Sequence, residues 1–367
     1  MSENKRPPMV QLRNVVKRFD NVLAVETIDL DIEEGSLVTL LGPSGCGKTT
    51  ILRMIAGLES CTEGDIYIKG KRINDIPVHK RNLGMIFQDY ALFPHKTIYD
   101  NVAFGLKYRN VPKKECRERV LRALETVRLP GVENRKPAQL SGGQQQRIAL
   151  ARAIVIEPDV LLMDEPLSAL DENLREEMRQ EVDNLQRQLG ITTIFVTHDQ
   201  REALSMSDKI IVLKDGLKQQ EGSPEEVYDS PVNHFVADFL GHCNFFNGVI
   251  KGRTQGMVEV QVDDGSILHS EEDKGWDVGS EIVLLVRAQK VELASAPSQP
   301  GQQALNTFEG SIVNRMYMGG EAWYFVKSDA GTVVHAINIS REAPFRVDDR
   351  VQIHVPPRQC KLLHKEG

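Results

Sequence analysis

Short apolar runs alternate with longer segments of helical periodicity over the first 240 residues or so of the chain. The clearest runs are SLVTLLG (36–42), DVLLMDE (159–165) and TTIFVTH (192–198). Each has the length of a strand and ends in polar residues, which is typical of strands buried on both faces of a parallel sheet. We therefore predict an α/β domain over residues 1–240.

A helix is predicted over residues 173–190 between two of these runs. Its apolar positions recur at helical spacing, and Gly190 is a plausible stop because glycine readily adopts the left-handed conformation that ends helices. The apolar residues at this spacing are Leu174, Met178, Val182, Leu185 and Leu189.

The pattern changes near residue 241. Short alternating runs follow one another between Gly and Asp turns, for example FFNGVI, GMVEVQVDDG, EIVLLVRAQKVEL and DRVQIHV. Such spacing predicts a small all-β domain of barrel type over residues 241–367. The Ser-, Pro- and Gln-rich segment 295–303 is predicted to be a loop between two halves of that domain.

Composition and charge exclude several functional classes of protein. A length of 367 residues suits two domains, and a net charge of −7 argues against a dedicated nucleic-acid binder. The five cysteines are scattered without a C-x-x-C pair, so we expect neither a disulfide framework nor a zinc site. No apolar run reaches membrane-spanning length, and the first residues have no apolar signal core, so we expect a cytosolic chain.

A glycine-rich segment provides the first candidate chemistry. GPSGCGKTT (42–50) matches the phosphate-loop pattern G-x-x-x-x-G-K-[ST], between a predicted strand and a predicted helix. Such a loop directs backbone N–H groups and a helix N-terminus at phosphate, while Lys48 reaches the β- and γ-phosphates and Thr49 binds Mg²⁺. The predicted ATP-binding residues are Gly42, Pro43, Ser44, Gly45, Cys46, Gly47, Lys48, Thr49 and Thr50.

Cys46 lies inside this loop and has two interpretations. A thiol close to a helix N-terminus can have a lowered pKa, so that its oxidation or alkylation would block ATP binding. Alternatively, Cys46 is an inert small residue.

Two adjacent acids follow the strand VLLMDE (160–165). Asp164 is predicted to hold Mg²⁺, directly or through water, and Glu165 to polarise the attacking water. The alternative is a surface acidic pair at a strand end, but the phosphate loop in the same chain favours the catalytic interpretation.

The segment LSGGQ (140–144), about 20 residues before the acidic pair, resembles the signature motif of ABC (ATP-binding cassette) ATPases. Ser141, Gly142 and Gly143 are predicted to open a helix and to form a second anion site with Gln144. One phosphate loop does not need a second anion site in the same chain. Two chains arranged head to tail do, because each signature then caps the γ-phosphate held by the other chain.

Further positions match this family residue by residue. The resemblance implies that Gln88 contacts Mg²⁺ and the attacking water, that Asp171 in SALD (168–171) crosses to the partner chain, and that His198 contacts the γ-phosphate. It also implies that Phe19 stacks on adenine. In isolation, a histidine after a strand or a single phenylalanine is more often structural. Their order relative to the other motifs favours the functional interpretation.

The resemblance also implies an architecture and partners. It predicts a P-loop NTPase domain at 1–240 with a helical subdomain at about 89–137 that contacts membrane subunits, and an OB-like TOBE-type domain at 241–367. The implied cofactors are ATP and Mg²⁺. The implied partners are a second ATPase subunit, two membrane permeases and an extracytoplasmic solute-binding protein, at the cytoplasmic face of a bacterial inner membrane, with no nucleic acid.

The sequence specifies the transported solute less well than it specifies the ATPase. NRKPAQLSGGQQQR (134–147), EPLSALDENLR (165–175) and LGITTIFVTHDQREALSMSDKI (189–210) are most similar to ATPases of polyamine (spermidine/putrescine) importers. Importers of ferric iron, sugars or oxyanions stay open as alternatives, as does pairing with a paralogue instead of a second copy. A soluble ABC protein acting on ribosomes or DNA is disfavoured by the single cassette and the negative charge. A generic P-loop kinase does not explain LSGGQ or His198.

Overall fold

The computed structural model describes residues 8–295, 304–338 and 345–365. The chain divides into two compact units, Met1–Val227 and Tyr228–Gly367. This division falls within helix α8 (Pro224–Asp229), and the domain limits of 1–240 and 241–367 stay predictions. Each unit is described separately below.

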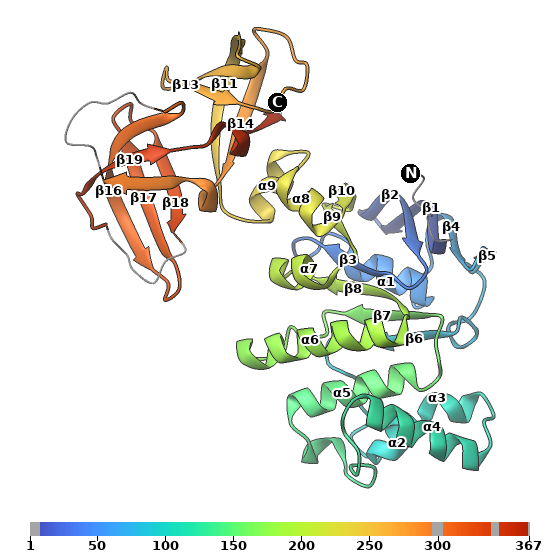
Figure 1. Ribbon diagram of the computed structural model, residues 1–367. Coiled ribbons are helices and arrows are strands. Elements are labelled where there is room, and N and C mark those ends of the chain that lie inside the picture. Colours follow the sequence, from blue (N-terminus) through green and yellow to red (C-terminus); the bar gives the residue numbers. More distant parts are fainter. Residues whose placement is uncertain (1–7, 296–303, 339–344, 366–367) are drawn as a thin grey trace. The chain divides into compact units, whose positions relative to one another are not determined.

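A six-stranded sheet forms the centre of the N-terminal unit, with the order β10-β9-β3-β8-β7-β6 (Figure 1). Its strands are β3 (Leu37–Leu41), β6 (Leu83–Ile86), β7 (Val160–Asp164), β8 (Thr192–Thr197), β9 (Lys209–Lys214) and β10 (Leu217–Gly222). All neighbours are parallel except β10, which is antiparallel to β9. The three apolar runs predicted as parallel strands form β3, β7 and β8, and every residue of these strands is buried.

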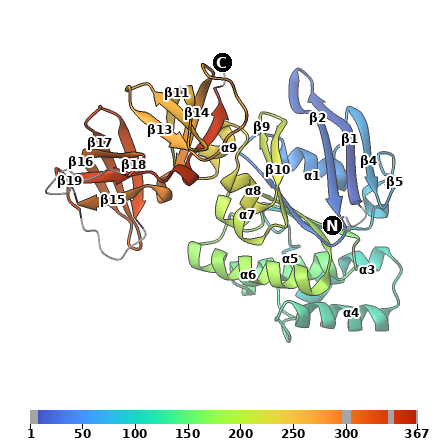
Figure 2. The same cartoon turned by 45° about the horizontal axis from the view of Figure 1, so that its top comes forward.

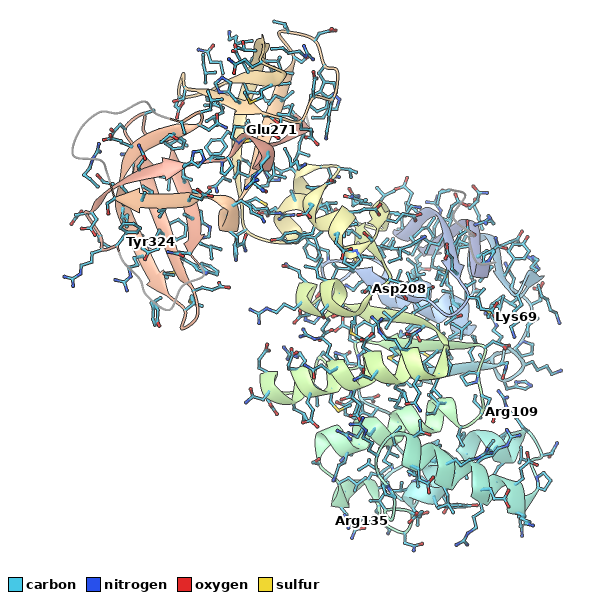
Figure 3. The ribbon with its side chains drawn as sticks, in the orientation of Figure 1. Lys69, Arg109, Arg135, Asp208, Glu271 and Tyr324 are labelled. Carbon is cyan, nitrogen blue, oxygen red and sulfur yellow. The ribbon has the colours of Figure 1, made fainter. Side chains whose placement is uncertain are left out.

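A second sheet, which the sequence did not predict, is antiparallel and has the order β2-β1-β4-β5. It comprises β1 (Pro8–Phe19), β2 (Val22–Glu33), β4 (Glu63–Ile68) and β5 (Lys71–Arg72). Helix α1 (Lys48–Ala56) packs against β2 and against β7 and β8. Figure 2 shows α1 beside β2. Lys69, after β4, forms an ion pair with Asp159, before β7, and so connects the two sheets (Figure 3).

Helices gather at one end of this unit (Figure 1). They are α2 (Ile98–Val102), α3 (Phe104–Tyr108), α4 (Lys113–Thr126) and α5 (Gly142–Ile154), with a 3₁₀ turn at Pro137–Gln139. Their apolar faces share one buried cluster with residues of β6, β7 and β8. Arg109 joins this helical region to the segment after α5 by donating from its guanidinium to the Ile156 carbonyl at 3.1 Å.

The predicted helix at 173–190 forms α6 (Glu172–Leu189), and Gly190 ends it in the left-handed conformation at φ 61°. Of the apolar residues at helical spacing, Met178, Val182 and Leu185 are buried and Leu174 is half-buried. Leu189, in the last turn of the helix, is 39% exposed. Helix α7 (Gln200–Met206) follows β8.

The C-terminal unit contains α9 (His234–Phe239) and two five-stranded antiparallel sheets. The sheet orders are β13-β12-β11-β14-β20 and β15-β19-β16-β17-β18. The strands are β11 (Cys243–Thr254), β12 (Met257–Val262), β13 (Ile267–Ser270), β14 (Glu281–Arg287), β15 (Glu292–Ser295), β16 (Thr307–Tyr317), β17 (Ala322–Ser328), β18 (Val333–Asn338), β19 (Arg350–His354) and β20 (Lys361–His364). The two sheets share one core, with Tyr324 fully buried in it (Figure 3).

The run EIVLLVRAQKVEL does not form one strand. A 3₁₀ turn at Ala288–Lys290 divides it into β14 and β15, which belong to different sheets. The loop predicted at 295–303 lies outside the described residues apart from its first residue. Among the helices that the structure describes, none is both long enough and apolar enough to cross a bilayer.

Candidate functional site

Most of the predicted site residues follow the carboxyl ends of four neighbouring parallel strands. The phosphate loop follows β3, His198 follows β8, Glu165 follows β7, and Gln88 lies just beyond β6. Because parallel strands end at the same edge of a sheet, the fold brings together residues that are far apart in sequence. Ligands of open α/β sheets bind at this edge.

The backbone of the phosphate loop requires glycine at particular positions. Gly45 and Gly47 have φ values of 82° and 101°, in the left-handed region that glycine adopts without strain. A Cβ atom on Gly47 would lie 2.6 Å from the Ala24 carbonyl oxygen, and one on Gly42 would lie 2.3 Å from that of Leu213. The loop is therefore enclosed by β2 on one side and by β9 on the other.

Lys48 directs its ammonium group into the loop. The side chain is only 4% exposed, and its Nζ donates to the carbonyl oxygens of Gly42 at 2.7 Å and Pro43 at 2.8 Å. An ammonium fixed in this way supplies concentrated positive charge beside the backbone N–H groups of a helix N-terminus. This arrangement suits a polyphosphate.

Thr49 and Asp164 lie together under the loop. The Thr49 hydroxyl donates to Asp164 Oδ1 at 2.7 Å, and Asp164 is buried at the end of β7. Burial raises the pKa of the Asp164 carboxyl, while the Thr49 hydrogen bond opposes that rise. A hydroxyl beside a carboxylate offers the hard oxygen ligands that Mg²⁺ prefers, so these residues fit the predicted metal site.

Glu165 faces His198 across the edge of the sheet. Glu165 Oε2 lies 3.2 Å from His198 Nδ1, and His198 is about half exposed. Glu165 has a φ of 44°, a left-handed conformation that costs a residue with a side chain about 1–2 kcal/mol. Backbone strain of this kind is concentrated at functional sites.

The turn that carries His198 is held by buried polar groups. The Thr197 hydroxyl donates to Glu202 Oε2 at 2.5 Å and accepts from the Asp199 backbone N–H at 2.9 Å. Asp199 caps α7 by accepting from the N–H groups of Arg201 and Glu202. Burial raises the pKa of the Glu202 carboxyl, and the Thr197 hydrogen bond opposes that rise.

Sequence reasoning missed Ser168 as a member of this site. Its hydroxyl accepts from Gln88 Nε2 at 3.3 Å and donates to the Glu165 carbonyl oxygen at 2.9 Å, so it connects the segment after β6 to the segment after β7. The available signal was its place as the first residue of SALD, from which only Asp171 was chosen.

The reactive interpretation of Cys46 assumed that the pKa of its thiol is lowered, and this assumption is wrong. The Cys46 thiol is buried beneath the loop, and burial raises its pKa, although the nearby Lys48 opposes that rise. A buried thiol with a raised pKa is a poor nucleophile. The structure thus favours the alternative of an inert small residue.

Phe19 ends β1 and is 41% exposed. The Lys17 ammonium lies 4.4 Å from the centroid of this ring. An exposed ring with one face next to a cation is available for stacking with a flat ligand. Its contact with adenine stays a prediction.

The LSGGQ residues lie at the start of α5 and not at the strand ends that carry the other predicted site residues. Ser141 is the N-cap of α5: its hydroxyl accepts from the Gln144 N–H at 3.4 Å, and Gln144 Oε1 accepts from the Ser141 N–H at 3.1 Å. No hydrogen bond or ion pair joins Ser141, Gly142, Gly143 or Gln144 to the phosphate loop among the described residues. Asp171 is likewise used as an N-cap, of α6.

Asp164 yields a prediction about stability and pH. A carboxyl whose pKa is raised on folding destabilises the protein at neutral pH, and this penalty disappears as the pH falls below its unfolded-state pKa. We therefore expect Asp164→Asn to raise the melting temperature of the nucleotide-free protein at pH 7, with a smaller gain at pH 4, as measured by circular dichroism.

The matched control is Asp100→Asn. The Lys107 hydrogen bond lowers the pKa of Asp100, so this carboxylate stabilises the protein at neutral pH and the substitution should have the opposite sign. Equal changes in melting temperature at both pH values for Asp164→Asn would contradict the prediction.

Two protein-family models match this chain, one in each unit. Residues 25–168 match the model described as ABC transporter, and residues 284–363 match the model described as TOBE domain. The first match begins within β2 and includes the phosphate loop, Gln88, LSGGQ and Glu165. The second lies within the β-sheets of the C-terminal unit.

Full-length relatives are also similar. The spermidine/putrescine import ATP-binding protein of Rubrobacter xylanophilus is 43% identical over 98% of this chain and 95% of its own length. The protein of the same name from Acetivibrio thermocellus is 42% identical over 98% of both chains. That of Haemophilus influenzae strain Rd is 46% identical over 85% of this chain and 83% of its own length.

Solved structures resemble about three fifths of the chain. One is cbiO1 from Clostridium perfringens, part of the cbiONQ ABC transporter complex, with a TM-score of 0.57, 30% identity and coverage of 60% of this chain and 91% of that chain. Another is the dimeric MJ0796 bacterial ABC transporter cassette, with a TM-score of 0.53, 36% identity and coverage of 59% and 99%. A further MJ0796 structure is a dimeric post-hydrolysis state bound to ADP and Pi.

Proposed function

This chain belongs to the ATP-binding subunits of ABC transporters, and from that premise we propose that it hydrolyses ATP to drive the import of spermidine and putrescine. The observation that carries the ATPase activity is the meeting of Lys48, Asp164, Glu165 and His198 at one edge of the parallel sheet. The solute class is supported by relatives of that printed name that are 42–47% identical to this chain.

Each group has a defined part in hydrolysis. Lys48 and the N–H groups of the loop hold the β- and γ-phosphates, and Thr49 and Asp164 would hold Mg²⁺, which neutralises phosphate charge when bound. The Glu165 carboxylate accepts a proton from the attacking water. His198, held at 3.2 Å from Glu165, contacts the γ-phosphate. Ser168 keeps Gln88 close to this water.

A second copy of the chain completes the site in this proposal. Ser141 and Gly142 are exposed at the start of α5, and Gly143 and Gln144 follow them in the first turn. A helix N-terminus favours an anion, yet among the described residues no hydrogen bond joins this one to the phosphate loop of its own chain. The dimeric MJ0796 cassettes support a paired arrangement. In this pair, each signature caps the γ-phosphate bound by the other subunit, and Asp171 lies near the interface.

Two permeases and a solute-binding protein complete the proposed importer. The helical region around 89–137 contacts the permeases, which hold the ATPase at the cytoplasmic face of the bacterial inner membrane. Closure of the ATPase pair on ATP then changes the access of the permeases, and hydrolysis reopens the pair.

The proposal is tested by uptake. We expect radiolabelled spermidine and putrescine to accumulate in cells that express this chain with its permeases and lack other polyamine importers. The same cells carrying the Glu165→Gln variant should show only background uptake. ATPase activity in the purified protein without Glu165-dependent polyamine uptake would contradict the solute class, and parallel assays with ferric iron, maltose and sulfate would then identify the solute.

A further inference from the structure

We infer that the C-terminal unit contains a binding site for a small phosphate-bearing anion, in a cavity of about 250 Å³ that is separate from the phosphate loop. Four cationic side chains line this cavity: Arg287, Lys290, Arg358 and Lys361. Tyr228 and one carboxylate, Asp229, lie beside them. This inference goes beyond the proposed transport function and does not depend on it.

The charge of the cavity is opposite to that of its surroundings. Residues 228–367 contain thirteen Lys and Arg against eighteen Asp and Glu, a net charge of −5. Against that background, four cations and one acid line a single small cavity. Grouped like charges repel one another, so a fold that retains them presents a positive potential suited to an anion.

These four cations also lack carboxylate partners. Elsewhere in the unit, Arg253, Arg350 and Lys365 each form an ion pair with an Asp or Glu. Among the described residues, no carboxylate oxygen lies within 4.0 Å of a charged nitrogen of Arg287, Lys290, Arg358 or Lys361. Their charge is therefore available to a ligand.

Arg287 gives the site a rigid, buried donor. The residue is 6% exposed, and its terminal nitrogens donate to the carbonyl oxygens of Ala237 at 2.7 Å and Tyr228 at 2.6 Å. Its guanidinium also lies 4.1 Å from the centroid of the Tyr228 ring. These contacts fix the group in place, yet its buried Nε–H has no hydrogen-bond partner in the described structure.

The buried Nε–H is closed off from solvent, so it is the charge of the fixed guanidinium that acts on the cavity. An anion in the cavity would offset this charge, which no carboxylate pairs with among the described residues. The unpaired charges of the four cations thus point to an anionic ligand.

The other cations converge on the cavity from separate segments. Lys290 ends the 3₁₀ turn after β14, Arg358 lies in the 3₁₀ turn at Pro357–Gln359, and Lys361 begins β20. Because Lys361 pairs with Leu285 across the sheet, it lies close to Arg287 on the neighbouring strand. Charged donors from several directions suit a compact tetrahedral phosphate group, to which arginine binds through a planar fork of N–H groups.

Calorimetric titration with inorganic pyrophosphate tests the site directly. The full-length protein is first saturated with a non-hydrolysable MgATP analogue, so that the phosphate loop is occupied. We expect residual pyrophosphate binding at constant ionic strength that is weakened about tenfold or more by the Arg358→Gln/Lys361→Gln double variant, since charge-assisted contacts are lost. A parallel arm measures co-sedimentation with phosphatidylglycerol vesicles, to distinguish a free phosphate compound from a lipid headgroup.

The matched control is the Lys251→Gln/Lys327→Gln double variant. It removes the same charge from exposed strand positions of the same unit, and it should bind like the unaltered protein. Binding in either arm that is lost only in the Arg358→Gln/Lys361→Gln variant supports the site and identifies the source of the phosphate. Absence of binding in both arms, or equal loss in both variants, would overturn the inference.

Discussion

Replacing Glu165 with Gln should lower the rate of ATP hydrolysis by about 10²–10⁴-fold, because an amide cannot take up the proton of the attacking water. The amide has the same shape as the carboxylate and can keep the 3.2 Å contact with His198. We therefore expect ATP affinity to be preserved and the ATP-bound pair of chains to accumulate. Phosphate release and size-exclusion chromatography with MgATP measure the two effects.

The control for Glu165→Gln is Glu63→Gln, the same chemical change at an exposed position of β4. It should leave hydrolysis unchanged. If Glu165→Gln hydrolysed ATP at a rate near that of the unaltered protein, Glu165 would not be the base, and the acceptor of the water proton would have to be sought elsewhere.

The second large effect is expected for Lys48→Ala, which should weaken ATP binding by about 10²-fold through the loss of charge-assisted hydrogen bonds to phosphate. The ammonium is buried within the loop and already held at 2.7 Å from the Gly42 carbonyl oxygen, so little reorganisation is needed to bind phosphate. Fluorescent-nucleotide titration of the purified protein gives the affinity.

Lys48 also supports the loop itself, so loss of affinity could follow from a loosened loop. Thermal unfolding of Lys48→Ala separates the two causes, because a role in phosphate binding alone leaves the melting temperature of the nucleotide-free protein nearly unchanged. Lys71→Ala, at an exposed position of β5, is the control for removal of a surface lysine. Unaltered ATP affinity in Lys48→Ala would refute the assigned role.

Strands β3, β7 and β8 of the parallel sheet could be predicted because each is a short, continuous apolar run followed by polar residues. The phosphate loop and the acidic pair could be predicted because their spacing reflects local geometry: a turn that needs glycine and a strand end that needs a carboxylate. The proximity of Gln88, Glu165 and His198 follows from strand order, which no local pattern contains. The Ser168 bridge depends on that same order and was therefore missed.

The antiparallel sheet of the N-terminal unit, β2-β1-β4-β5, could not be predicted from the sequence because its central strand is irregular. Strand β1 has irregular register against both of its partners, and Asn14 has a φ of 49°, so the buried positions of β1 do not alternate regularly.

In the C-terminal unit, strands β13 and β20 are only four residues long, which is too short to show a reliable period in the sequence. The two interpretations of Cys46 could not be separated from the sequence, because burial, which raises the pKa of its thiol, cannot be read from its position near a helix start.

The position of β3 at the centre of its sheet has a consequence for biosynthesis. Leu37 of β3 pairs with Thr193 on one side, and Thr39 pairs with Ile210 on the other. The Gly216 N–H donates to the Cys46 carbonyl oxygen at 3.2 Å. A ribosome that adds about 5–20 residues per second therefore needs on the order of ten seconds or more to deliver these partners after β3 has emerged. Throughout that interval the nascent chain carries an unpaired strand whose residues are apolar except for Thr39. The phosphate loop therefore gains its native surroundings late, after β9 has been translated.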